Sequence, residues 1–130
     1  MTLKDNPSFG SYSVDDLDKA KAFYRDTLGL EVSEEHGMGL ELRLAQGARV
    51  FLYPKKDHRP AAFTVLNFVV NDINTAVVEL RTAGVRFERY GGEIGTDGSG
   101  IHRSGPQGDG PDIAWFKDPA GNILSVLQEA

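Results

Sequence analysis

The hydrophobic pattern of the chain repeats once. The stretch from Ser13 to Val32 aligns with the stretch from Val69 to Glu88, so that Val14 falls on Val70 and an offset of 56 residues separates the two copies. Self-similarity at a fixed offset indicates duplication of one structural unit. The sequence therefore predicts two copies of the same module within one chain.

Each copy begins with a strand that leads into an amphipathic helix. Asp16 and Asp72 stand where a short carboxylate caps the first helical turn. Apolar residues follow at helical spacing, and they are Leu17, Ala20, Tyr24 and Leu28 in the first copy and Ile73, Ala76, Val77 and Leu80 in the second. Gly29 and Gly84 suit the left-handed residue that ends a helix.

Alternating segments after each helix predict the remaining strands. In the first copy they are "GLELRLA" and "ARVFLYP", and in the second copy they are "VRFERY", "DIAWFK" and "NILSVLQ". The strand that precedes the helix of the second copy is "FTVLNFVV". The predicted fold class is α+β, with tandem βαβββ modules. Module 1 covers about residues 8–54, a linker residues 55–62 and module 2 residues 63–128, all within a single domain of residues 1–130.

Composition narrows the possible functions. The chain has 130 residues, 40% hydrophobic and 25% charged, with a net charge of −5 and no basic run longer than Lys55-Lys56. Nucleic acid is therefore not an expected partner, since binding to phosphates needs clustered basic residues. The chain has no cysteine, which excludes disulfides and a thiolate nucleophile. No apolar run approaches the roughly 20 residues that cross a bilayer, and no signal peptide is recognised, so we expect no membrane partner and a cytoplasmic location.

The tandem βαβββ pattern, with helices that open on V-x-D-[LI] and "DPAGN" before the last strand, resembles the vicinal oxygen chelate superfamily. That superfamily includes glyoxalases, extradiol dioxygenases, fosfomycin-modifying enzymes and bleomycin resistance proteins. The resemblance implies two curled half-barrel sheets around a cavity, with the helices outside, and a homodimer. It also implies, for the enzymes, a divalent metal held by four side chains from the first and last strands of each module.

Those four metal positions fall on Phe9, Phe51, Val65 and Ser125 in this sequence. A phenyl ring or an isopropyl group donates no lone pair, and a neutral hydroxyl is a poor sole ligand. We therefore expect no metal and no cofactor. The three histidines, at positions 36, 58 and 102, also lack the spacing of a helical metal site.

Side chains alternate between the two faces of a strand. Residues whose side chains point to the same face as the four metal positions should therefore line the cavity. The predicted ligand-binding residues are Phe9, Ser11, Arg49, Phe51, Tyr53, Val65, Asn67, Ser125 and His102. Two interpretations of Asn67 stay open: it bonds to Ser125, Ser11 or a water, or it contacts the ligand. Trp115 is expected in the core.

Residues 90–111 are rich in glycine and too long for an ordinary turn. Either they form a flap that carries His102 and Arg103 over a bound ligand, with His102 as the candidate general base, or they form a solvated loop.

Three functions remain in view. The leading hypothesis is metal-independent binding of a small, partly aromatic or apolar molecule in the inter-module cavity. The first alternative is a glyoxalase-type isomerase or lyase, either metal-free or with a displaced metal. Its titratable candidates are Arg49 and Tyr53 in the cavity, Glu41 and Arg43 on the neighbouring strand, and His102 on the loop. The second is a sensing or interaction module whose cavity Phe9 and Phe51 fill.

Overall fold

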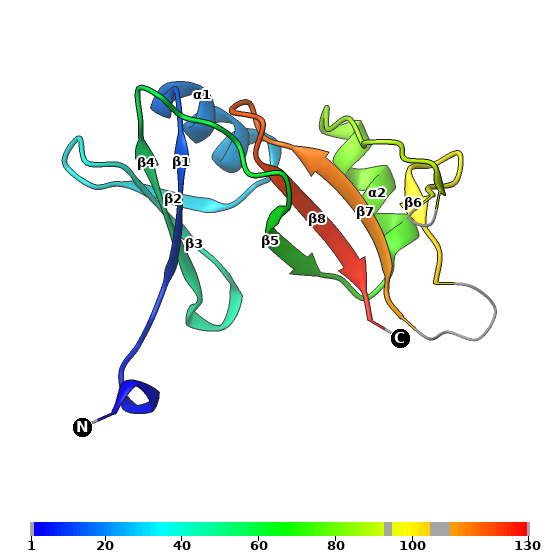
Figure 1. The fold of residues 1–130 in the computed structure, drawn as a ribbon, viewed down its shortest axis with the longest axis horizontal. Coiled ribbons are helices and arrows are strands. Elements are labelled where there is room, and N and C mark those ends of the chain that lie inside the picture. The colour runs from blue at the N-terminus through cyan, green and yellow to red at the C-terminus, as the bar shows by residue number, and fades with distance from the viewer. Residues whose placement is uncertain (1, 93–94, 105–109, 130) are drawn as a thin grey trace. The chain divides into compact units, whose positions relative to one another are not determined.

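The computed structural model describes residues 2–92, 95–104 and 110–129. The chain forms two compact units, Met1–Arg59 and Pro60–Ala130, and their boundary lies within the segment predicted as a linker. Figure 1 shows the elements of both units in chain order.

Unit 1 contains a four-stranded mixed sheet, one helix formed by α1 and η2 together, and two short 3-10 helices. Its elements are η1 (Leu3–Asp5), β1 (Gly10–Val14), α1 (Leu17–Lys21), η2 (Ala22–Thr27), β2 (Glu31–Glu34), β3 (Leu40–Arg43), η3 (Ala45–Gly47) and β4 (Arg49–Pro54). The strand order is β1-β4-β3-β2, with β1 parallel to β4 and the other pairs antiparallel. The predicted helix turns π-helical at η2, where the Leu28 N–H donates to the Phe23 carbonyl, five residues back.

Unit 2 repeats this plan. Its elements are β5 (Thr64–Val69), α2 (Ile73–Thr82), β6 (Ile101–His102), β7 (Asp112–Lys117) and β8 (Ile123–Gln128). The strand order is β5-β8-β7-β6, and β5 is parallel to β8. Both sheets have the same strand order and the same pattern of parallel and antiparallel pairs. The predicted duplication and the α+β class are therefore confirmed. The cavity between the modules stays a prediction.

The predicted caps form in both copies. Asp16 accepts a hydrogen bond from the Lys19 N–H at 3.1 Å, and Asp72 accepts from the Asn74 N–H at 3.0 Å. Gly29 has a φ of 73° and Gly84 a φ of 106°, the left-handed conformation predicted for a helix stop. No helix among the described residues is long and apolar enough to span a membrane.

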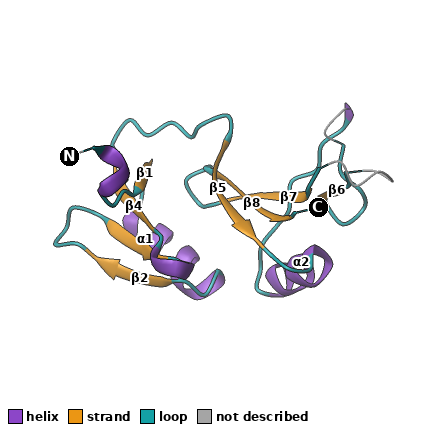
Figure 2. Ribbon diagram, turned by 90° about the horizontal axis from the view of Figure 1, so that it is seen from below, coloured by secondary structure: helices purple, strands orange, loops and turns teal. Residues whose placement is uncertain are grey.

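One face of each sheet packs against its own helix and forms the core. In unit 1 the buried apolar side chains are Val14, Ala20, Tyr24, Leu40, Leu42, Val50 and Leu52, and in unit 2 they are Ile73, Val77, Val85, Phe87, Ile101, Ala114, Phe116, Leu124 and Val126. Figure 2 shows α2 against one face of its sheet. Because side chains alternate along a strand, the residues between these core positions occupy the opposite face, called here the open face of each unit.

The predicted strand "VRFERY" is wrong. Only Phe87 of that segment pairs with β7, through a single bridge to Phe116, and the Glu88 N–H donates to the Trp115 carbonyl. The strand β6 then takes up the pairing, with Ile101 opposite Ala114. Phe87 and β6 therefore share one edge of the unit 2 sheet, and the glycines of the intervening described residues, 89–92 and 95–100, favour a loop over a β-ladder.

Candidate functional site

The open face of unit 1 carries the predicted residues of β1 and β4. Ser11 pairs with Phe51, which in turn pairs with Glu41 on β3. The rings of Phe51 and Tyr53 are stacked, with centroids 6.5 Å apart and planes 18° apart. These side chains share one face, as the alternation predicted, and form an aromatic surface with polar neighbours.

Phe9 and Arg49 form a second contact on this face. The Arg49 guanidinium lies 4.7 Å from the centroid of the Phe9 ring, within the range of a cation–π interaction. The Phe9 residue is 55% exposed, so this ring belongs to the surface of the unit. The first of the four family metal positions is thus an aromatic side chain held by an arginine.

Glu41 accepts hydrogen bonds from two arginines, Arg43 and Arg49. The Arg43 Nε donates to Glu41 at 3.1 Å and the Arg49 Nη1 donates to it at 3.3 Å. The hydrogen bond from Arg43 and then that from Arg49 hold the pKa of Glu41 below its usual range, against the opposing effect of burial. Glu31 lies 3.7 Å from the Arg43 Nη1 and supplies a second carboxylate, so two carboxylates balance the two guanidinium groups of this cluster.

Ser13 and His58 meet at the end of β1. The Ser13 Oγ lies 2.6 Å from the His58 Nδ1, and both side chains are partly buried. The sequence placed His58 in the linker and assigned it no role. The contact ties the end of module 1 to its own first strand.

The open face of unit 2 is centred on Ser125. The sheet register places Ser125 between Asn67 on β5 and Trp115 on β7. Ser125 is fully buried, and its hydroxyl donates to the Asn67 Oδ1 at 2.5 Å. Of the two interpretations of Asn67, bonding to Ser125 is confirmed. The Asn67 amide nitrogen has no hydrogen-bond partner among the described residues, and the residue is exposed.

Val65 departs from the predicted alternation. The register between β5 and β8 shifts between Thr64 and Leu66, which pair with the consecutive residues Ile123 and Leu124. Val65 is the extra residue of this bulge and has no partner on β8. Strict alternation therefore fails here, although Asn67 regains the expected face.

Trp115 lies on the open face, and the expectation of a core position is wrong. Its ring centroid lies 5.4 Å from that of Tyr90, with planes 68° apart, and 6.3 Å from that of His102. All three residues are partly buried. Burial, followed by the nearby Glu88 carboxylate, raises the pKa of Tyr90 above its usual value. The alternation of Trp115 with the buried Ala114 and Phe116 predicts this face, and the strand register places Trp115 opposite Ser125.

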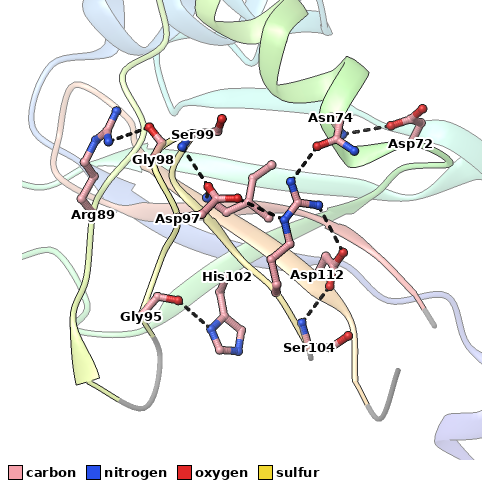
Figure 3. Close-up of polar contacts among 12 residues, drawn as sticks. Asp72, Asn74, Arg89, Gly95, Asp97, Gly98, Ser99, His102, Ser104 and Asp112 are labelled. Carbon is pink, nitrogen blue, oxygen red and sulfur yellow. Dashed lines mark hydrogen bonds and ion pairs between the residues drawn. The ribbon is translucent and has the colours of Figure 1, made fainter. Parts of the chain in front are cut away.

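His102 and Arg103 have different surroundings. The His102 Nδ1 lies 3.0 Å from the Gly95 carbonyl oxygen, whereas Arg103 bonds to Asp97 at 3.1 Å and to Asn74 at 2.8 Å, as Figure 3 shows. Arg103 also approaches Asp112 at 3.5 Å. A flap in which Arg103 faces a ligand is therefore not what the structure has, because this side chain fastens the loop to α2 and β7.

Two carboxylates of this network have pKa values below their usual range. For Asp97, burial opposes the shift, and the N–H groups of Ile101 and Ser99 together with Arg103 outweigh it. For Asp112, the Ser104 N–H is the main cause, and Arg103 adds to it.

Figure 3 also shows the Arg89 side chain donating to the Gly98 carbonyl, at 2.7 Å. The loop's described residues, 95–104, are thus held by polar contacts. The other predicted flap residues, 93–94 and 105–109, lie outside the described part of the chain.

The residues at the four metal positions do not fit a divalent ion. Phe9, Phe51 and Val65 offer no donor atom, and the Ser125 hydroxyl is committed to Asn67. Across residues 2–92, 95–104 and 110–129, no group of three or more His, Cys, Asp or Glu side chains is placed to hold a metal.

Two capped βαβββ units with the same strand order, each with one open face, define a protein of the glyoxalase-like class. The model of the Glyoxalase/Bleomycin resistance protein/Dioxygenase superfamily matches residues 9–126, and the chain belongs to this superfamily.

Related proteins differ in activity. The chain is 31% identical over 134 residues to mitochondrial methylmalonyl-CoA epimerase of Bos taurus, an alignment that covers 91% of this chain and 70% of the epimerase. The fosfomycin resistance protein FosX of Listeria monocytogenes has a TM-score of 0.70 at 15% identity, covering 96% of this chain and 93% of its own. Lactoylglutathione lyase of Agrobacterium tumefaciens has a TM-score of 0.66 at 21% identity, covering 94% and 92%. The two structural likenesses show the fold alone.

Proposed function

We propose that this protein binds a small, partly aromatic molecule on the open faces of its sheets without a metal ion. The observation that carries the proposal is the set of side chains at the four family metal positions, which supply two phenyl rings, an isopropyl group and a hydroxyl already bonded to Asn67. Metal coordination needs several lone-pair donors, and the open faces offer aromatic area with a few polar groups instead.

The remaining predicted ligand-binding residues fit this role. Ser11, Phe51 and Tyr53 share the open face of unit 1, and Asn67, Ser125 and His102 share that of unit 2. Apolar rings contribute buried area, while sparse hydrogen-bonding groups fix the orientation of a ligand. The cavity between the modules in which such a ligand would lie stays part of the proposal, as does the homodimer.

The experiment is a thermal-shift screen of aromatic metabolites and antibiotics, run first in EDTA and then repeated with a divalent ion in place of the chelator. The proposal expects at least one compound to raise the melting temperature in EDTA, since a ligand that binds only the folded state stabilises it. A panel in which stabilisation appears only after a divalent ion is added would overturn it. Light scattering on the same sample tests the homodimer.

A second candidate is a glyoxalase-type isomerase or lyase. It is favoured by the identity of 31% to the epimerase and by an imidazole on the open face, His102, whose Nε2 has no partner among the described residues. A general base needs such a free nitrogen near its substrate. Turnover of a carbonyl substrate in EDTA that is lost in the His102→Gln variant would favour this candidate over simple binding.

A further inference from the structure

We propose that Tyr90, Trp115 and His102, called here the aromatic cluster, bind a planar aromatic ligand that carries a hydroxyl or N–H group. The Nε2 of His102 accepts the hydrogen bond from that group. This inference rests on the proposed function and adds to it the place of the ligand on unit 2 and the chemical class that the site selects.

The contact between His102 and Gly95 fixes the tautomer of the imidazole. A carbonyl oxygen has no proton to give, so at 3.0 Å the Nδ1 must be the donor. A neutral imidazole carries only one N–H, and its second nitrogen then has a free lone pair. Figure 3 shows this second nitrogen on the side of the ring away from Gly95. The His102 side chain therefore presents an acceptor, and it selects ligands that donate.

Trp115 supplies the flat surface beside this acceptor. Its ring stands edge-to-face with Tyr90 and tilted at 42° to His102, and the three rings are only partly buried. Aromatic rings attract further rings in offset or edge-to-face arrangements, beyond the effect of the buried area alone. A planar aromatic ligand therefore matches the cluster better than a flexible aliphatic one.

Asn67 offers a complementary group on the same face. Ser125 lies between Asn67 and Trp115 in the register, and it holds the amide by its carbonyl oxygen. The amide nitrogen, a donor of two hydrogen bonds, is left without a partner among the described residues. Neighbouring strands lie about 4.8 Å apart, so about 10 Å separates the backbone positions of Asn67 on β5 and Trp115 on β7.

The imidazole is held in place by its surroundings. His102 pairs with Ile113 in the sheet, and the next residue, Arg103, is anchored by Asp97 and Asn74. A hydrogen-bonding group whose backbone and ring are both fixed loses little conformational entropy when a ligand binds. The aromatic cluster is thus arranged in advance of binding.

The test compares two probes that differ by one proton donor: 2-naphthol and its methyl ether, 2-methoxynaphthalene. Trp115 is the only tryptophan in the chain, so its indole N–H gives a single NMR signal that reports on this site. We expect 2-naphthol to shift that signal and to bind about tenfold more tightly than the ether, the ratio that one hydrogen bond is worth. Long-range proton–nitrogen NMR should also show a shift of the His102 Nε2 with 2-naphthol alone.

Two variants separate the roles of the rings. His102→Phe keeps a flat ring but removes both nitrogens, so it should bind the two probes with equal affinity. Trp115→Leu should bind neither probe. Calorimetry measures the affinity of each variant for each probe. Val78→Ala is the control, because Val78 is exposed on α2, which covers the other face of this sheet. It should bind as the unsubstituted protein does.

The outcomes distinguish this inference from the proposed function. If 2-naphthol binds no better than its ether to the unsubstituted protein, or leaves the Trp115 signal unmoved, the inference is overturned even where other compounds stabilise the protein. If no compound in the EDTA screen binds, the proposed function fails and the inference fails with it. The nitrogen shift needs no variant, so a variant that does not fold leaves the test intact.

Discussion

The hydrogen bond between Ser125 and Asn67 gives the sharpest prediction, because its two partners differ in burial. Ser125 is 0% exposed, whereas Asn67 is exposed, and the hydroxyl donates to the amide oxygen at 2.5 Å. Asn67→Ala leaves a buried hydroxyl without its partner, at a cost of about 1–3 kcal/mol in the free energy of unfolding. Ser125→Ala leaves only a surface amide that water can reach, at a cost of about 0.5–1.5 kcal/mol.

The assay is a double-mutant cycle from urea unfolding, followed by the fluorescence of Trp115, which lies in the same unit. The two single variants and the double variant should give a coupling free energy of about 1 kcal/mol. Asn71→Ala is the matched control, since Asn71 is exposed and lies just beyond β5, and it should stay within about 0.5 kcal/mol of the unsubstituted protein. A Ser125→Ala variant less stable than Asn67→Ala, or a coupling near zero, would refute the assignment.

Three further outcomes are expected. Gly39→Ala should lower the free energy of unfolding by about 1–3 kcal/mol or more in chemical denaturation, because a Cβ at Gly39 would lie 2.1 Å from the Leu52 carbonyl oxygen; a neutral effect would contradict this backbone contact. The pKa values of Asp97 and Asp112 are lowered in the folded state, so their contribution to stability is present above about pH 4 and is lost as the pH falls below it. The amide protection factors of residues 95–104, which correct for the slower intrinsic exchange in acid, should fall on acidification, and Asp112→Asn should flatten that fall. Ser125→Glu buries a carboxylate, so the melting temperature of this variant should be lower at pH 7 and recover in part towards pH 4. Adding Mn²⁺, Ni²⁺ or Zn²⁺ should leave that melting temperature unchanged. A rise on adding metal would show that neighbouring donors exist.

The parts of the fold that follow from local chemistry were predictable from sequence. The caps at Asp16 and Asp72 and the left-handed Gly29 and Gly84 depend on a few neighbouring residues, and both copies form them. Strict alternation along β4 likewise separates Val50 and Leu52 from the open face, because a buried face tolerates no slip of register.

The parts that depend on distant contacts were not predictable. Phe87 and β6 share one edge of β7 across an inserted loop, and no local pattern marks that division. The bulge at Val65 shifts the register by one residue, and Arg103 finds its partner Asn74 on α2, far along the chain. The aromatic cluster was missed for the same reason, since Tyr90 and Trp115 meet only after the edge has paired.

The most direct test of the account is the affinity of 2-naphthol, measured by calorimetry in EDTA and again with saturating Ni²⁺, on protein whose metal content is determined by mass spectrometry. The four family metal positions hold no set of donors, so we expect less than one equivalent of metal per ten chains and a dissociation constant equal in both buffers within about twofold. A stoichiometric metal, or binding that disappears in EDTA and returns with Ni²⁺, would contradict the metal-independent site.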